Sequence, residues 1–393
     1  MNSRDSATSA PADTLVAVDT GVGTAHTAAP GDTALAAEAT APPEETRVDE
    51  TIEPAKDTSP AACIPNPFVP PYAKGEWRNS LETGVLTIPM GAPNHRGQDV
   101  IVAAGEPQRL IAKFAYGAID KDLKDEDVEV FYQPDAPCGA WESLGVFPTS
   151  EDGEYGTMWG VADDGGRIFV ELPMAKRLPV GVYPVRMLVK GDLSIAAFTL
   201  WVTAPSVSVV VTDIDGTLTT SDFELITQIF TDLFSGSYVP EAYPGGQDVL
   251  WAYRQKGYQI IYVTGRPDLL RAQTQTWLVD LGYPPGVVHL TDTNTQAFPT
   301  DAGVAAYKTD FLNKVVAEAQ AAFYAAYGNA TTDIHAYANV NIPKNRTYII
   351  GANAGQEGTV AVNAYPSHLP TAQAAPAALV PGPTPPDVNK GWW

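Results

Sequence analysis

A change of sequence pattern at Ser206 constrains the fold of this 393-residue chain more than any other feature. Val207–Val211 is an unbroken apolar run, which is typical of a strand buried on both faces. Beyond it, strand patterns and helical patterns alternate as far as Thr347–Ile350. This alternation predicts a parallel sheet with helices on both faces, and such sheets bind ligands at the carboxyl ends of their strands.

The expected elements of this α/β region are separated by short connections. Strands are predicted at Gln259–Val263, Val287–Leu290, Ala321–Tyr327 and Thr347–Ile350, and helices at Gly246–Gln255, Pro267–Leu281, Ala302–Glu318 and Thr331–Ala338.

Residues 65–204 follow a different pattern, in which short alternating runs recur between turn signals. About seven short strands at this spacing predict an all-β antiparallel sandwich. The runs are Val85–Ile88, Asp99–Ala103, Arg109–Phe114, Val128–Tyr132, Arg167–Leu172, Val182–Val189 and Ala196–Val202.

The two ends of the chain show neither the periodicity of a helix nor that of a strand. Residues 1–64 are rich in Ala, Thr, Pro and acidic residues, so we expect a disordered linker that buries too little to offset its ordering entropy. Residues 371–393, which are rich in Ala and Pro and end in Trp392 and Trp393, are expected to form a flexible tail.

The net charge of −22 narrows the choice of partners. Such a chain repels polyphosphates, so nucleic acid is not an expected partner, and it also repels anionic membrane surfaces. The sequence contains no run of about 20 apolar residues, so it predicts no transmembrane helix. The first ten residues lack the pattern of a signal peptide, which leaves a cytoplasmic protein or an exported one whose signal has been removed. Cys63 and Cys138 form no metal-binding motif, and the sequence leaves open whether they pair.

The strand Val207–Val211 leads directly into Thr212-Asp213-Ile214-Asp215-Gly216-Thr217. Two carboxylates at positions i and i+2 can face one pocket, where one attacks phosphorus and the other handles the proton of the leaving group. Hard oxygen ligands this close together favour Mg²⁺. The alternative is a plain turn with solvated aspartates.

Three further polar sites accompany predicted strands and helices. Thr264-Gly265-Arg266 is suited to holding a phosphoryl oxygen at a helix start, although a routine helix cap explains it equally well. Lys308 can neutralise a phosphoryl group, whereas an isolated lysine is usually a solvated surface residue. Asn329 and Asp333 can complete a metal site, or can simply form a turn and a helix start. Their common order along the chain favours one phosphate-and-metal pocket.

These motifs resemble those of the haloacid dehalogenase superfamily. The finer resemblance is to the LNS2 domain shared by lipins and by membrane-associated phosphatidylinositol transfer proteins of the Nir/RdgB type. It is carried by Asp213–Thr219, Ile260–Asp268, Ala325–Asn329 and Asp333–Tyr337, and extends over residues 205–370. The segment Leu178–Asp192 resembles the sandwich-like region that precedes LNS2 in Nir/RdgB proteins.

The resemblance implies a Rossmann-like core and a role for each matching residue. Asp213 would be the nucleophile that forms an aspartyl-phosphate, and Asp215 the general acid and then base. Thr264 and Lys308 would bind phosphoryl oxygens, with Thr217, Gly265 and Arg266 also contributing to substrate binding. Mg²⁺ would be held by Asp213, the carbonyl of Asp215, Asp333 and Asn329.

Two functions are consistent with this resemblance. The first is a Mg²⁺-dependent phosphatase that hydrolyses phosphatidate or a related phosphomonoester, with peripheral membrane contact. The second is a non-catalytic module that binds phosphatidate or phosphoinositide headgroups. Nir/RdgB proteins often lack the catalytic aspartates, and both are present here.

Two other segments of the sequence have distinctive compositions. Asn94–Gly97 with Asp99 can be a ligand patch, although a loop network is the simpler interpretation. Tyr238–Gly246 is expected to belong to a small flap over the pocket, as the superfamily resemblance implies.

Overall fold

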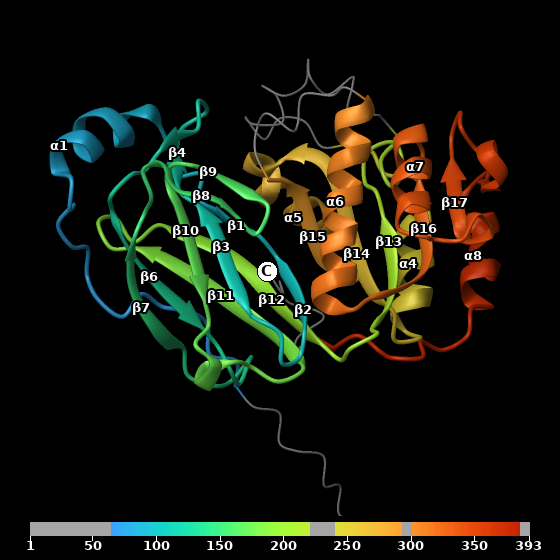
Figure 1. The fold of residues 1–393 in the computed structure, drawn as a ribbon, viewed down its shortest axis with the longest axis horizontal. Helices are drawn as coiled ribbons and strands as arrows, with labels where there is room; N and C mark the ends of the chain where they lie inside the picture. Colours follow the sequence, from blue (N-terminus) through green and yellow to red (C-terminus); the bar gives the residue numbers. More distant parts are fainter. Residues whose placement is uncertain (1–63, 221–239, 293–300, 386–393) are drawn as a thin grey trace, which may run out of the picture. The chain divides into compact units, whose positions relative to one another are not determined.

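The computed structural model describes residues 64–220, 240–292 and 301–385. The linker expected at residues 1–64 therefore lies almost wholly outside the described residues. Two β-rich layers at residues 96–203 are followed by a parallel sheet with helices (Figure 1). None of the helices among the described residues is both long and apolar enough to cross a bilayer.

The parallel sheet has six strands in the order β15-β14-β13-β16-β17-β18. The first strand in the sequence, β13, lies at the centre between β14 and β16. The bounds are β13 (Ser208–Thr212), β14 (Gln259–Pro267), β15 (Val287–Thr291), β16 (Ala322–Gly328), β17 (Thr347–Ile350) and β18 (Val360–Val362).

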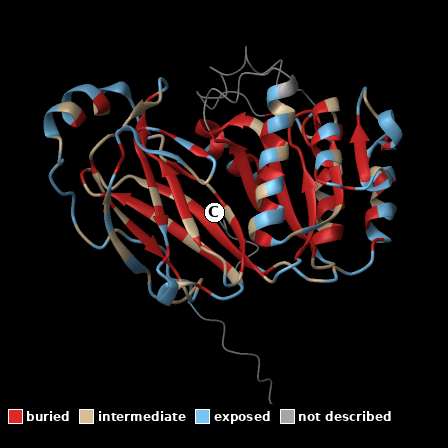
Figure 2. Ribbon diagram, in the orientation of Figure 1, coloured by how far each residue is buried: buried red, intermediate tan, exposed pale blue. Residues whose placement is uncertain are grey.

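Helices cover both faces of this sheet because alternate strand residues point in opposite directions. Val210 packs with residues of the helices α4 (Gly246–Arg254), α5 (Arg271–Asp280) and α8 (Tyr365–Gln373). Val209 and Val211 pack on the other face with α6 (Asp301–Ala319) and α7 (Thr331–Asn339). Figure 2 shows the strands of this sheet buried and one side of α6 exposed.

The β-rich region is a sandwich of a five-stranded sheet, β2-β12-β11-β6-β7, and a three-stranded sheet, β1-β3-β10. Its strands are antiparallel except for β2, which runs parallel to β12. The bounds of the strands in these two sheets are β1 (Arg96–Gly97), β2 (Val100–Ala103), β3 (Arg109–Lys113), β6 (Asp127–Tyr132), β7 (Glu142–Pro148), β10 (Arg167–Glu171), β11 (Gly181–Val189) and β12 (Ile195–Thr203). Two separate two-stranded sheets are formed by β4 (Ala115–Tyr116) with β5 (Lys121–Asp122) and by β8 (Asp152–Met158) with β9 (Val161–Asp164).

The sandwich and the parallel sheet share a buried apolar cluster. Ile101 of β2 and Trp201 of β12 belong to the same cluster as Phe311 and Val315 of α6. Trp201 is fully buried. The outer surface of the five-stranded sheet therefore packs against the helical layer at this point.

One predicted strand is wrong. Val85–Ile88 lies in helical turns that run through α1 (Ser80–Glu82), η1 (Thr83–Thr87) and η2 (Ile88–Met90). The helical period buries Thr83 and Thr87 and leaves Val85 and Leu86 more than half exposed, at 59% and 55%. The alternation of apolar residues there was therefore not the signature of a strand face.

The expected flexible tail at 371–393 is also wrong for residues 371–385. The helix α8 continues to Gln373, and the chain beyond it hydrogen-bonds to the start of β13 and to the turn before β14. Val380 accepts a backbone hydrogen bond from Ser208, and Gly382 donates one to Gly257. Extended Ala/Pro-rich chain can satisfy backbone groups in this way without any hydrophobic periodicity. Residues 386–393, including Trp392 and Trp393, lie outside the described residues.

Cys138 is disulfide-bonded. Cys63, the other cysteine of the chain, lies outside the described residues.

Candidate active site

The carboxyl end of the central strand β13 carries the two aspartates of the first motif. Asp213 and Asp215 are both buried, at 3% and 7% exposure. The backbone N–H of Asp213 donates to the carbonyl of Tyr327 in β16, at 3.0 Å, which continues the sheet for one more residue. Gly216 then turns the chain with φ of 70°, in the left-handed region that glycine adopts without strain.

Lys308 of α6 joins Asp213 to the fourth motif. Its Nζ atom lies 2.7 Å from Oδ1 of Asp213 and 2.6 Å from Oδ1 of Asp333. All three side chains are at most 4% exposed. One buried ammonium therefore bridges the carboxylate that follows β13 and a carboxylate in the first turn of α7.

Asp333 is held at the start of α7 by backbone donors. Its Oδ2 accepts hydrogen bonds from the N–H groups of Asn329, at 3.0 Å, and Ala330, at 3.1 Å. The carboxylate packs directly on Gly328, where an added Cβ would lie 2.6 Å from the Cβ of Asp333. A side chain at position 328 would thus displace Asp333 from the pocket.

Thr217 and Asn329 complete the inner face of the pocket. The hydroxyl of Thr217 lies 3.0 Å from Oδ2 of Asp213 and 3.2 Å from Oδ1 of Asn329. Asn353, in the loop after β17, donates through Nδ2 to the carbonyl of Asn329 at 2.9 Å. Sequence reasoning did not identify Asn353, because no strand-end motif marks that loop.

The second motif binds Asp215 rather than Asp213. The hydroxyl of Thr264 donates to Oδ2 of Asp215 at 2.9 Å. The guanidinium of Arg266 approaches both oxygens of the same carboxylate, with Nη2 at 2.7 Å from Oδ1 and Nε at 3.0 Å from Oδ2. Arg266, 1% exposed, is thus committed to Asp215, while Gly265 contributes backbone between the two donors.

Burial governs the electrostatics of the pocket. Burial raises the pKa of Asp213 to about 7, because Lys308 lowers it less than burial and the neighbouring Asp333 and Asp215 raise it. Burial alone would lower the pKa of Lys308, but Asp213 and Asp333 outweigh it and raise that pKa. Three carboxylates against the two cations Lys308 and Arg266 leave one excess negative charge in a desolvated site.

The donor set is compatible with a Mg²⁺ ion. Mg²⁺ takes oxygen ligands and usually keeps several waters, so one or two carboxylates suffice to hold it. Asp213 and Asp333 supply carboxylates, and Asn329 supplies an amide oxygen that faces the same space. Among the described residues, no group of three or more His, Cys, Asp or Glu side chains lies in an arrangement that could hold a metal ion.

The structure brings the predicted site residues together in two groups. Lys308, Asp333, Thr217 and Asn329 surround Asp213, and Thr264 and Arg266 surround Asp215. Of the expected flap, residues 240–246 are described, whereas Tyr238 lies outside the described residues. Ala242 pairs with Thr219 in an isolated bridge, and Tyr243 packs against the core next to Tyr365.

Comparisons with known proteins match both regions of the chain. Residues 93–202 match the beta-sandwich domain of PITM 1-3, and residues 210–351 match the PITM 1-3 LNS2 domain. These matches confirm the predicted fold class, an antiparallel sandwich followed by a haloacid dehalogenase-like LNS2 domain with a parallel sheet.

Full-length relatives are considerably longer than this chain. It is 33% identical over 287 residues to protein retinal degeneration B of Drosophila melanogaster. It is 30% identical over 289 residues to membrane-associated phosphatidylinositol transfer protein 1 of Homo sapiens. The alignments cover 72% and 73% of this chain, but only 20% of each relative.

Proposed function

Because the chain belongs to the PITM 1-3 family of β-sandwich and LNS2 domains, we propose that its Asp213 pocket is the centre of a magnesium-dependent phosphomonoesterase. The proposed substrate is phosphatidate or a related lipid phosphate, with peripheral membrane contact during turnover. The observation that carries the proposal is the ion-paired arrangement of Lys308 between Asp213 and Asp333.

The proposed reaction proceeds in two displacements. A carboxylate oxygen of Asp213 attacks phosphorus, and the bond from phosphorus to the leaving-group oxygen breaks as that oxygen takes a proton from Asp215. Water then attacks the phosphorus of the aspartyl-phosphate and gives a proton back to Asp215. Inorganic phosphate leaves, and Asp213 is regenerated as a carboxylate.

The surrounding residues would stabilise charge on the transferring group. In this proposal, Lys308 and the hydroxyl of Thr264 would bind phosphoryl oxygens, each by exchanging its contact with Asp213 or Asp215 for one with the substrate. Mg²⁺, when bound, would neutralise charge on the phosphoryl group. Asp213, Asp333, Asn329 and the carbonyl of Asp215 would hold it.

The proposal is tested by phosphate release from phosphatidate in mixed vesicles and from p-nitrophenyl phosphate. We expect turnover that EDTA removes and added Mg²⁺ restores, and that Asp213→Asn abolishes. Asp280→Asn, at the exposed end of α5, is a matched control that should retain full activity. Hydrolysis that survives Asp213→Asn would refute Asp213 as the nucleophile.

A second function is favoured by the pairing of Arg266 with Asp215. Arg266 and the hydroxyl of Thr264 already bind both oxygens of the Asp215 carboxylate, at 2.7–3.0 Å, so a leaving group has to compete with them for contact with Asp215. A pocket held this way is suited to binding a phosphomonoester headgroup without cleaving it. The Homo sapiens relative is named a membrane-associated phosphatidylinositol transfer protein, which agrees with lipid binding.

Vesicle flotation separates the two functions. A binding module should float with phosphatidate vesicles and should remain bound when EDTA is added, because its contacts with the headgroup resist EDTA. It should release no phosphate from any ester in a panel. Lys308→Gln should then abolish flotation, since it removes the central cation of the pocket. Measurable phosphate release from wild-type protein would exclude the purely non-catalytic function.

A further inference from the structure

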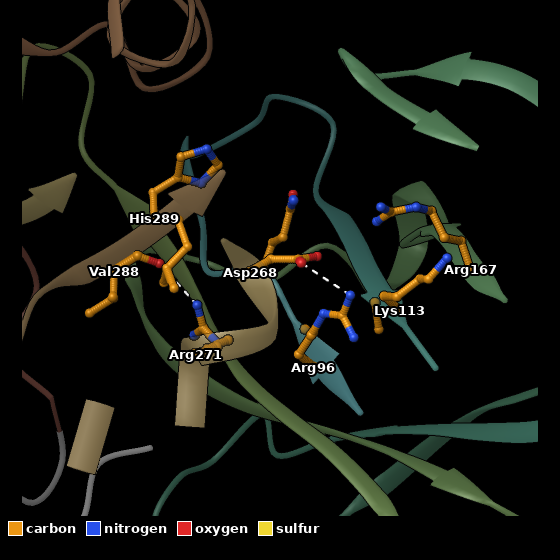
Figure 3. Close-up of a pocket in the computed structure, with 11 residues that line it drawn as sticks. Arg96, Lys113, Arg167, Asp268, Arg271, Val288 and His289 are labelled. Carbon is orange, nitrogen blue, oxygen red and sulfur yellow. Dashed lines mark hydrogen bonds and ion pairs between the residues drawn. The ribbon is translucent and has the colours of Figure 1, made fainter. Parts of the chain in front are cut away.

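Two charged residues of the sandwich reach into the segment that follows the second motif. They are Arg96 in β1 and Asp99 just before β2, both of which belong to the polar cluster Asn94–Asp99. Their partners are Asp268 and Arg271, which begin the short helix η4 (Asp268–Leu270) and the helix α5. Figure 3 shows Arg96 facing Asp268 across a pocket also lined by Arg271 and Val288.

The first link is an ion pair between Arg96 and Asp268. Nη2 of Arg96 lies 3.0 Å from Oδ1 of Asp268, and both side chains are at most 8% exposed. The same guanidinium is oriented by Asp120 of the sandwich, which accepts from Nη1 at 2.6 Å and from Nη2 at 2.7 Å. The orientation of the Arg96 guanidinium toward Asp268 is therefore set by a residue of its own domain.

The second link is centred on Asp99, whose side chain is completely buried. Its Oδ1 accepts from the backbone of Thr199, at 2.9 Å, and from Nη2 of Arg271, at 2.5 Å. Its Oδ2 accepts from the backbone N–H of Val288 in β15, at 3.0 Å. One sandwich carboxylate thus holds both the start of α5 and the neighbouring strand.

These links lead by direct contacts to the pocket. Asp268 is separated from Arg266 only by Pro267. The helix α5 that begins at Arg271 also supplies Thr274, which accepts from Nη1 of Arg266 at 3.1 Å. Trp277 of the same helix lies with its ring 6.0 Å from the guanidinium carbon of Arg266. Arg266 in turn binds Asp215.

We infer that Arg96 and Asp99 of the sandwich are positioning residues for the second motif, acting on Arg266 and Asp215 through Asp268 and α5. The sandwich is then a structural part of the phosphate pocket. This inference rests on the proposed function only in treating that pocket as the working site. Both ion pairs are buried, and Arg96, Asp99 and Arg271 are also held by hydrogen bonds, so few alternative geometries are open to the backbone that they connect.

A role limited to stabilising the association of the two domains predicts a different result for other interdomain ion pairs. It would make every interdomain ion pair equivalent, including Arg109 of β3 with Glu318 of α6, whose Nη1 and Oε1 atoms lie 2.5 Å apart. Glu318 lies ten residues beyond Lys308 in α6, and within the described part of the chain neither Arg109 nor Glu318 forms a hydrogen bond or ion pair with residues 264–278. Arg109→Gln is therefore the matched control.

The test is hydrogen–deuterium exchange of the full chain, which requires no activity. In Arg96→Gln we expect amides of residues 264–278 to exchange about tenfold faster, because opening of that segment becomes easier, while β13 and β16 are unchanged. Arg96→Lys keeps the charge and should restore most of the protection. Arg109→Gln should leave residues 264–278 as in the wild type.

Two results would overturn the inference. One is faster exchange spread evenly over β13, β16 and residues 264–278, which indicates a global loss of stability. The other is an equal local effect in Arg109→Gln. Should Arg96→Gln fail to fold, Asp268→Asn repeats the comparison with Arg96 still paired to Asp120.

Turnover of p-nitrophenyl phosphate on the same samples separates this inference from the proposed function. Absence of wild-type turnover would reject the phosphatase while leaving the exchange comparison decisive. With an active wild type, we expect kcat of Arg96→Gln to fall in parallel with its loss of local protection and KM to change little. Unchanged kcat despite faster exchange would overturn the positioning role.

Discussion

Arg266 and Asp215 form a buried ion pair in which the guanidinium contacts both carboxylate oxygens, and their side chains are only 1% and 6% exposed. Two opposing consequences follow from this one contact. It fixes the orientation of the carboxylate, and it occupies both of the oxygens that a leaving group would have to contact. Which consequence dominates decides between catalysis and binding.

Arg266→Gln should destabilise the protein by roughly 3–5 kcal/mol, because it leaves Asp215 as a buried charge without its cation. Arg266→Lys keeps the charge but loses the forked geometry of the guanidinium, so its free energy of unfolding should lie between those of the wild type and Arg266→Gln. The measurement is urea unfolding at equilibrium, followed by circular dichroism. A loss below about 1 kcal/mol would mean that water reaches Asp215 and replaces the guanidinium.

Lys308→Gln should lower phosphate turnover at least about a hundredfold, the usual effect of removing one preorganised charge-stabilising donor. The initial rate on p-nitrophenyl phosphate at saturating Mg²⁺ measures this. Lys314→Gln is the matched control, since Lys314 lies on the same helix, is one-third exposed and pairs with Asp292 outside the pocket. Equal losses in the two variants would show that α6 tolerates no substitution, and would remove the special role of Lys308.

Gly328→Ala should displace Asp333 and cost about 1–3 kcal/mol of stability, as expected when a side chain is forced into a packed site. The added Cβ would lie 2.6 Å from the Cβ of Asp333. Gly265→Ala is the control, because its added Cβ would meet only Val304 at an ordinary 3.7 Å. Thermal unfolding with and without Mg²⁺ measures both effects, and Gly328→Ala should lose most of the Mg²⁺-dependent shift in Tm.

The stability of the sandwich should fall in mild acid because of His95. Burial lowers the pKa of His95 to about 4, with Asp192 opposing that shift. Its Nδ1 accepts from the backbone N–H of Ala115 at 3.3 Å, so the neutral ring is the one that fits. The unfolded chain binds the proton more tightly, so this contribution to stability is complete above about pH 6.5 and is lost as the pH falls toward 4.

The size of the His95 effect is at most roughly 3 kcal/mol over that interval, from the free-energy equivalent of the pKa shift. Urea unfolding from pH 7.5 to 4 measures it, with the difference between wild type and His95→Gln isolating the one residue. His289, whose pKa burial also lowers, should leave a residual slope in the same direction. A slope of unchanged size in His95→Gln would assign the acid sensitivity to other groups.

Sequence reasoning located the pocket because backbone geometry limits where strand ends can lie. Asp213 and Asn329 follow β13 and β16, whereas Thr264 lies in the last part of the neighbouring strand β14 and not at the expected helix start, and parallel strands bring their carboxyl ends to one edge. Lys308 lies on a helix, where nothing local distinguishes it from a surface lysine. Its placement depended on family resemblance, and the structure brings its ammonium to Asp213.

Other features left no local signal in the sequence. Asp99 and Arg271 are 172 residues apart and meet only because two domains pack together. Asn353 lies in an unremarkable Gly-rich loop, and the choice of Asp215 as the partner of Arg266 depends on side-chain packing. At Val85–Ile88 the apolar spacing fits both a strand and a helical turn, and the burial of Thr83 and Thr87 selects the turn.

The docked segment that follows α8 has a practical consequence for anyone who excises the C-terminal domain. A fragment that stops at residue 370 would strip Ser208 of the carbonyl of Val380 and deprive Arg254 of the carbonyl of Pro383, 2.6 Å from its Nη2. The amino end of β13 would then lose the backbone hydrogen bond that it makes outside the sheet. An expressed fragment should therefore extend to residue 385 or beyond, so that it keeps the segment after α8 that satisfies these donors.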